Sequence, residues 1–304
     1  MKKKTAAFVS ATLLATSLLA ACGKAPAGDA LSPEPVPETT APAVSTTDLS
    51  SGSVTVYDFG ETKLHVFFTG DALGDVAYIV EGADALVGIE LPSFTEGLDA
   101  WKAYADGLGK PMDDVFLCSH AAGASYISGI NVYGTQGAKD SIASGSAYAT
   151  TQGLYETFGE AFHGGSDIAE INQVVSGPVT VAGISFNLIE RGEAYDLEIP
   201  AINAVYTHML GKTSHSILTS LEHMDEIAAV LKTYQTKGYE RILPSHGGPE
   251  GQDAVAEKLS YIEKAKELAA ANDTAADFIR AMQEAFPDYD GENYLEMTAG
   301  YLYQ

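Results

Sequence analysis

The first half of the chain alternates apolar and polar residues in short runs. Alternation with a period of two is typical of half-buried β-strands, and Gly- or Asp-containing turns separate the runs. The runs lie at residues 54–59, 63–68, 77–80 and 85–90. Because no helical segment lies between them, they predict an antiparallel meander at the start of the fold.

The pattern changes to helical spacing after Pro92. Residues 95–108 carry apolar side chains on one face, which predicts an amphipathic helix. A further apolar run at residues 115–118 follows and leads into His120. Strand, helix and strand at this spacing predict one right-handed crossover that brings His120 to the edge of a sheet.

The second half again places strands before helices. Strands are predicted at residues 174–181, 186–190, 195–199, 204–210, 216–218 and 239–244. Helices are predicted near residues 138–148 and at 222–236, 253–270, 274–286 and 292–303. Two sheet-rich halves of this kind predict an α/β fold, a four-layer αββα sandwich in one domain with extra C-terminal helices from about residue 274.

The N-terminus has the pattern of a secretory signal. Three lysines precede an apolar segment at residues 5–19, which is too short to span a membrane as a helix. Small residues then lead to Cys22, and this end resembles the lipobox of bacterial lipoproteins, in which the cysteine is acylated. The alternative is an ordinary signal peptide with an incidental cysteine.

The lipobox resemblance implies a cleaved signal peptide at residues 1–21 and an acyl anchor at Cys22. The mature protein is then expected on the extracytoplasmic face of a bacterial membrane, with the lipid bilayer as a partner. Residues 22–53 are rich in Pro, Ala, Ser and Thr and carry no apolar face, which predicts a flexible tether. The folded domain is expected to span residues 54–304.

Charge and cysteine content exclude some classes of function. The net charge is −24, and such a surface repels phosphate backbones, so nucleic-acid binding is not expected. The chain has two cysteines, and after acylation of Cys22 only Cys118 remains, so no internal disulfide can form. The position of Cys118 in an apolar run predicts a buried packing residue.

Three parts of residues 54–270 resemble the metallo-β-lactamase superfamily. They are residues 75–90, His120 after its strand, and residues 243–247, where His246 resembles the last metal-binding histidine of the family. The resemblance implies the αββα sandwich. It also implies a short loop with two histidines, an aspartate and a third histidine, which in the family binds two zinc ions that activate water.

Only His120 matches that loop motif. Ala122, Ala124 and Ser125 stand at the positions of the other three ligands, so the two-zinc site of the family cannot be assembled from this loop. Glu90 stands where the family has an aspartate at the end of a strand. The resemblance makes it a candidate to orient a histidine or to act as a base.

Other histidines offer a relocated site. His208 and His215 flank a turn, and if the two flanking strands pair as a hairpin, the imidazoles meet near its end. With His120 and His246 they provide four candidate ligands for one zinc or another divalent metal ion, although no cofactor is certain. The alternative is that these are hydrogen-bonded structural histidines.

Two functions follow from these observations. The first is a binding protein or pseudoenzyme, whose cleft holds a small-molecule ligand and is lined by Tyr126, His163, Asn203 and Tyr206. The second is a divergent metal-dependent hydrolase that uses the histidines and Glu90. The loss of three ligand positions favours the first, because lost ligands weaken a metal site by orders of magnitude. The histidines retained at separate strand ends favour the second.

Overall fold

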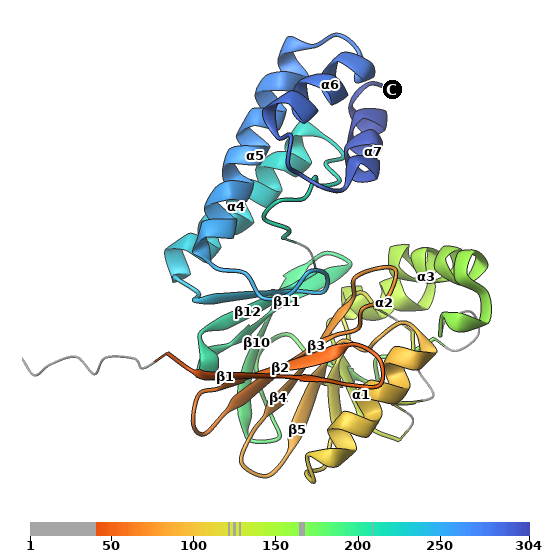
Figure 1. The fold of residues 1–304 in the computed structure, drawn as a ribbon, viewed down its shortest axis with the longest axis vertical. Helices are drawn as coiled ribbons and strands as arrows, with labels where there is room; N and C mark the ends of the chain where they lie inside the picture. Colours follow the sequence, from red (N-terminus) through yellow and green to blue (C-terminus); the bar gives the residue numbers. More distant parts are fainter. Residues whose placement is uncertain (1–40, 121, 124–125, 128, 164–167, 209) are drawn as a thin grey trace, which may run out of the picture. The chain divides into compact units, whose positions relative to one another are not determined.

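The computed structural model describes residues 41–120, 122–123, 126–127, 129–163, 168–208 and 210–304 (Figure 1). Within these residues the chain forms two β-sheets and seven α-helices. The predicted signal peptide and Cys22 lie outside the described residues, as do Ala124 and Ser125. None of the helices in the described part has both the length and the apolarity needed to cross a bilayer.

The first sheet has eight strands in chain order. They are β1 (Ala43–Asp48), β2 (Ser53–Asp58), β3 (Lys63–Phe68), β4 (Val76–Glu81), β5 (Leu86–Ile89), β6 (Asp114–Phe116), β7 (Asn131–Gly134) and β8 (Gln173–Val174). Neighbours are antiparallel from β1 to β5 and parallel from β5 to β8. The predicted antiparallel meander is therefore confirmed.

Strand β1 corrects the predicted start of the folded domain. All six of its residues are exposed, so no apolar pattern marks the strand in the sequence. It pairs with β2 along its whole length, and backbone hydrogen bonds of this kind need no apolar face. The predicted boundary at residue 54 is therefore wrong, and the predicted tether is wrong for residues 43–48.

The second sheet has five strands in the order β13-β12-β11-β10-β9. They are β9 (Gly177–Val181), β10 (Ile184–Arg191), β11 (Ala194–Ile199), β12 (Ala204–Thr207) and β13 (Arg241–Pro244). Strands β9 to β12 are antiparallel to their neighbours, and β12 and β13 are parallel. As a result, the chain leaves β12 and β13 at the same edge of the sheet.

The predicted strand at residues 216–218 is wrong, and so is its hairpin with β12. The C-terminal helices satisfy the backbone of this segment instead. The amide of Leu218 donates to the hydroxyl of Thr298 at 2.8 Å, and that hydroxyl donates to the carbonyl of Ser216 at 2.8 Å. Strand β12 pairs only with β11 and β13 among the described residues, so no hairpin brings His215 to the end of β12.

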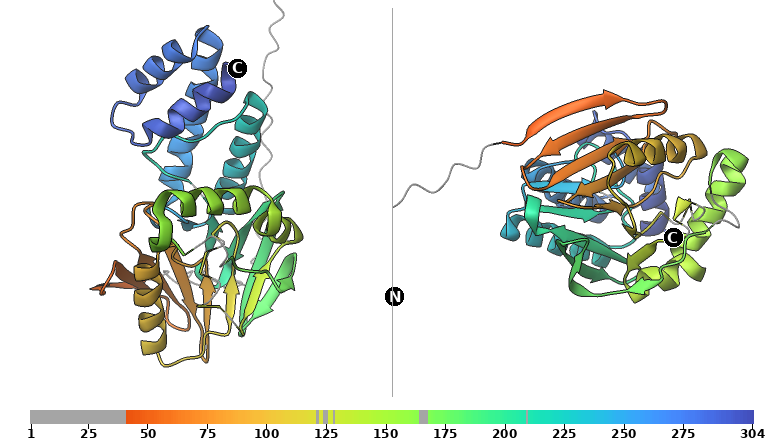
Figure 2. Two further views of the ribbon diagram at one scale, coloured as in Figure 1. Left: turned by 90° about the vertical axis from the view of Figure 1, so that its right-hand side faces the viewer. Right: turned by 90° about the horizontal axis from the view of Figure 1, so that it is seen from below.

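The helices lie outside the two sheets (Figure 2). They are α1 (Thr95–Gly107), α2 (Gln136–Ser144), α3 (Ser146–Phe158), α4 (Leu221–Lys237), α5 (Gln252–Ala271), α6 (Ala275–Ala285) and α7 (Glu292–Leu302), with 3-10 turns η2 (Gly159–Ala161) and η3 (Pro200–Ile202). The single helix predicted near residues 138–148 is two helices, because Gly145 separates α2 from α3.

Alternating side chains of β12 show how the layers are built. Ala204 and Tyr206 face the core between the two sheets, whereas Val205 faces a second core formed with α4 to α7. On the other side Trp101 of α1 is buried against β5, where a Cβ at Gly88 would lie 3.6 Å from the indole, at ordinary contact distance. The order helix, sheet, sheet, helix confirms the predicted αββα sandwich with extra C-terminal helices.

Candidate metal centre

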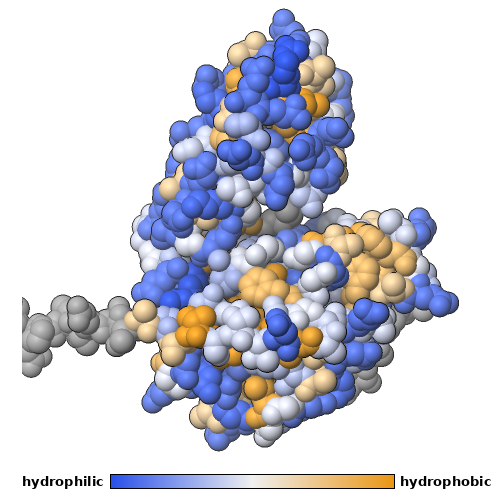
Figure 3. Space-filling view, viewed as in Figure 1, coloured by the Kyte–Doolittle hydropathy of each residue, from blue (hydrophilic) through white to orange (hydrophobic). Residues whose placement is uncertain are grey.

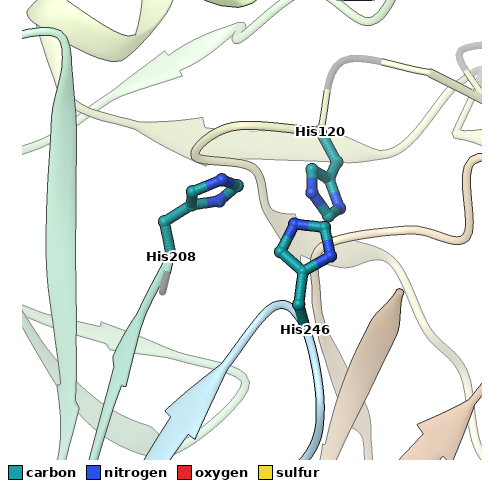
Figure 4. Close-up of side chains that lie close together, drawn as sticks. All are labelled: His120, His208 and His246. Carbon is teal, nitrogen blue, oxygen red and sulfur yellow. The ribbon is translucent and has the colours of Figure 1, made fainter. Parts of the chain in front are cut away.

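Three histidines converge at one edge of the sandwich (Figure 4). His120 follows β6, His208 follows β12 directly, and His246 lies in the loop after β13. Their ring centroids are 5.4, 5.2 and 5.2 Å apart, and one nitrogen from each ring lies within 4.8 Å of the others. The structure therefore brings together three of the four histidines expected from the sequence.

Backbone pairing explains why His208 and His246 meet. Because β12 and β13 are parallel, their carboxyl ends lie side by side. The amide of Ser245 donates to the carbonyl of His208 at 2.9 Å, and the carbonyl of Ser245 accepts from the amide of Val76 at 2.7 Å. These bonds join the ends of both sheets at the histidine cluster.

The environment of His246 fixes its tautomer. Its Nδ1 lies 3.1 Å from the carbonyl oxygen of Leu73 and 3.2 Å from Oδ1 of Asp75. A carbonyl can only accept, so Nδ1 carries a hydrogen, and in the neutral ring the lone pair is on Nε2. A carboxylate or carbonyl behind a histidine is the usual way in which proteins orient a metal ligand.

The titratable groups of the cluster shift one another's pKa values. Burial alone would raise the pKa of Asp75, but nearby groups, led by the charge of His120, lower it to about 2. Burial lowers the pKa of His246, but the Asp75 carboxylate outweighs this effect and the pKa is raised. Burial and the two neighbouring imidazoles lower the pKa of His208 to about 3, so its ring is neutral, the form that binds metals.

Glu90 positions the loop that carries His120. Its side chain is fully buried, and its Oε1 accepts hydrogen bonds from the amides of Cys118 and Ser119 at 3.1 and 2.9 Å. Its Oε2 accepts from the amide of His120 at 3.2 Å, and the hydroxyl of Tyr206 donates to Oε1 at 2.6 Å. Glu90 also has a φ of 56°, which is strained for a residue other than glycine.

The cluster fits a divalent cation. The Nδ1 atoms of His120 and His208 are buried and have no hydrogen-bond partner within the described residues. Buried polar atoms without partners are rare in proteins, and coordination by an ion would satisfy such nitrogens. Three protein ligands with one position left open are the pattern of catalytic zinc sites. Ala122 is buried and apolar, so it adds no ligand.

His215 does not belong to this cluster. Its Nδ1 lies 3.1 Å from the hydroxyl of Tyr261 in α5, and its amide donates to the carbonyl of Asp290 at 2.9 Å. These contacts hold it against the C-terminal helices, because the hairpin expected from the sequence does not form.

The residues expected to line a ligand cleft are also separated. Tyr126 and His163 lie together, with ring centroids 5.7 Å apart. Tyr206 is fully buried beneath the cluster, and Asn203 is exposed at the opposite end of β12. The prediction that these four residues share one cleft is therefore wrong for Tyr206 and Asn203.

Sequence reasoning missed the role of Asp75. This residue is 2% exposed and directly precedes β4, all of whose residues are buried. A carboxylate next to a fully buried strand needs a compensating partner. That position was the available signal, although the sequence does not show that the partner is His246.

A pocket of about 520 Å³ opens beside the histidines. His246 lines one side of it. Residues 210–216, including His215, and residues at and just before the start of α7, including Asp290, also line it. A small molecule in this pocket would lie next to the cluster.

Comparison with known proteins supports this description of the fold. The stereoselective inverting sec-alkylsulfatase Pisa1 from Pseudomonas sp. matches with 17% identity and a TM-score of 0.57, over 84% of this chain and 50% of that chain. A double mutant of Pisa1 matches with 15% identity and a TM-score of 0.53, over 86% and 50%. DIM-1 metallo-β-lactamase matches with 12% identity and a TM-score of 0.45, over 72% and 100%. The chain therefore shares with the alkylsulfatase an αββα sandwich of the metallo-β-lactamase type.

The likeness to the alkylsulfatase concerns the fold alone. The metallo-β-lactamase-like domain spans about half the length of the alkylsulfatase chains that it matches. No family model and no curated protein matches this sequence. Any chemistry must therefore be argued from the residues of this chain.

Proposed function

We propose that this chain is a metal-dependent hydrolase with one divalent ion, zinc or a similar metal, held by His120, His208 and His246. One observation carries the proposal: three imidazoles from separate segments converge, with one nitrogen from each within 4.8 Å of the others. Histidines that serve only the core are hydrogen-bonded to neighbours. In this cluster two rings keep buried nitrogens without such partners in the described part of the chain.

The surrounding residues have separate tasks in this proposal. A divalent ion at such a site supplies a Lewis acid and lowers the pKa of water toward neutrality. Asp75 holds the ring of His246 with the lone pair on Nε2, and Glu90 fixes the loop before His120. The adjoining pocket receives the substrate.

The competing function is a binding protein or pseudoenzyme. It requires the same pocket but no bound metal, and the substitutions at three family ligand positions favour it. The three-histidine cluster favours the hydrolase, because it does not depend on those positions.

Metal analysis of the purified protein separates the two functions. We expect about one equivalent of zinc or another divalent ion per chain, as three histidine ligands with an open position are typical of such sites. His246→Ala and His208→Ala should lose the metal, whereas His215→Gln should retain it, because His215 lies outside the cluster. A metal-free wild type whose melting temperature does not change with added zinc would refute the hydrolase and support the binding protein.

We also propose that the protein is anchored to a bacterial membrane on its extracytoplasmic face through an acylated Cys22. The lipobox-like sequence before this cysteine supports the anchor. Mass spectrometry of the protein purified from bacterial membranes should find a diacylglyceryl group on Cys22. Cys22→Ala should release the protein from the membrane fraction, and an unmodified Cys22 in the mature protein would contradict the anchor.

A further inference from the structure

The pocket beside the histidines has carboxylates in its wall. Glu250 and Asp290 both line it. Lys212 is the only lysine or arginine among the described residues that line it, and its Nζ donates to Oδ2 of Asp253 at 2.6 Å. This ammonium group has an anionic partner. A second ammonium group, that of Lys258, lies behind the wall and donates to the carbonyl of Ser214 and the hydroxyl of Ser216. The carboxylates of Glu250 and Asp290 are therefore the charged groups that the lining itself offers to a ligand.

Both carboxylates can accept further hydrogen bonds from a ligand. Each oxygen of Glu250 accepts one backbone amide, from Gly211 at 3.1 Å and from Lys212 at 2.7 Å. A carboxylate offers about four lone-pair sites, so Glu250 can still accept from a ligand. Asp290 makes its bonds to Thr213 and His215 through its main chain, and its side chain is exposed.

The start of α7 adds to the negative charge. The N-terminus of a helix ordinarily attracts anions. Here Asp290 and Glu292 flank that terminus, with Glu292 in the first turn. On the face in Figure 3 hydrophilic residues of either charge cover most of the surface of the C-terminal helices. The negative sign comes from the composition of the whole chain, whose net charge is −24. Such a field attracts cations and repels anions.

We propose that this pocket selects substrates with a positively charged group, such as an amine, and disfavours anionic esters such as sulfate or phosphate esters. The inference rests on the proposed hydrolase, because it assigns the substrate class of that site. A cation would contact Asp290 and Glu250 while the group to be hydrolysed lies beside His246. Binding sites for sulfate or phosphate normally carry arginine or lysine free to bind them, and Lys212 is already paired.

Three probes of equal chain length test the charge preference. N-acetyl-1,6-diaminohexane carries a positive charge, N-hexylacetamide is neutral, and 6-acetamidohexanoate is negative. Isothermal titration calorimetry of the purified protein should give the tightest binding for the cation, about fivefold tighter than for the neutral probe, as expected for a partly exposed charge pair. The anion should bind most weakly, and added salt should reduce the differences.

A matched pair of variants locates the preference in the pocket. Asp290→Asn should reduce the preference for the cation, whereas Asp288→Asn should not, because Asp288 is exposed on the same segment but outside the pocket. Equal binding of the three probes, preference for the anion, no binding at millimolar concentration, or an unchanged preference in Asp290→Asn would each overturn the inference.

Repeating the binding measurements after chelation tests the charge preference independently of the proposed metal site. The change caused by Asp290→Asn is compared between zinc-loaded and chelator-treated protein, so that the charge of the ion itself cancels. If the protein binds no metal but keeps the Asp290-dependent preference, the hydrolase is refuted and the charge selectivity stands. If the protein binds metal and shows no such preference, the selectivity is refuted and the hydrolase stands.

Discussion

Replacing Glu90 by glutamine should loosen the loop that carries His120. The buried carboxylate accepts three consecutive backbone amides and one tyrosine hydroxyl. A carboxamide has only one acceptor oxygen, and its nitrogen can only donate. In Glu90→Gln at least one of these buried donors therefore faces another donor.

The cost follows from the hydrogen bonds. The remaining bonds lose their charge assistance, and one buried N–H group is left without an acceptor, so the free energy of unfolding should fall by about 3 kcal/mol. For a domain of this size that is a decrease in melting temperature of about 6–12 °C. Because the loop positions His120, zinc affinity should also fall by about tenfold or more.

The assay is calorimetric melting combined with zinc titration in competition with a chelator. Glu193→Gln is the matched control, since the Glu193 carboxylate is exposed and accepts bonds from Ser141 of α2 and Ser146 at the start of α3 and not from the loop of His120. Its melting temperature should change much less and its zinc affinity should not change. A Glu90→Gln protein with the melting temperature and zinc affinity of the wild type would refute the proposed positioning role.

Two other perturbations have defined outcomes. Burial lowers the pKa of His65 below its usual 6.5 despite the Glu81 carboxylate. Because the unfolded chain then binds the proton more readily than the folded one, the free energy of unfolding should fall as the pH drops below about 6.5. Melting of the wild type should therefore depend on pH between about 5 and 7 more steeply than melting of His65→Gln, and parallel curves would contradict this. Gly248→Ala should be strongly destabilising in denaturant titrations, because the new Cβ would lie 2.5 Å from the ring of Phe68 at a φ of 105°. Gly183→Ala, with a φ of 79° and open space around it, should show only the smaller cost of the backbone conformation, and equal losses would contradict the clash.

The parts of the fold that the sequence predicts are those with strong periodicity. The strands from residue 53 to 89 and the helices α1, α4 and α5 bury one clear face, so their positions follow from the spacing of apolar residues. Strand β1 escapes this reasoning because all of its residues are exposed and only backbone pairing holds it.

The candidate site was predictable only in part, for a related reason. His120, His208 and His246 each follow a strand, and strand ends at one edge of a sandwich meet in space. The sequence predicts His215 among them through a hairpin, but tertiary contacts override that hairpin, since Thr298 of α7 bonds to the backbone of Ser216 and Leu218. Asp75 contacts a residue far away in the sequence, and apolar spacing carries no information on such a pair.

Because the three histidines come from distant segments of the chain, the proposed ion would also connect those segments. An ion held by all three would act as a reversible cross-link between the two sheets, closing loops of roughly 90 and 40 residues in any partly unfolded chain that still binds it. Its binding energy would be added to folding energy, by an amount that grows with the logarithm of the free metal concentration. The stability of the protein would then depend on the metal supply of its surroundings.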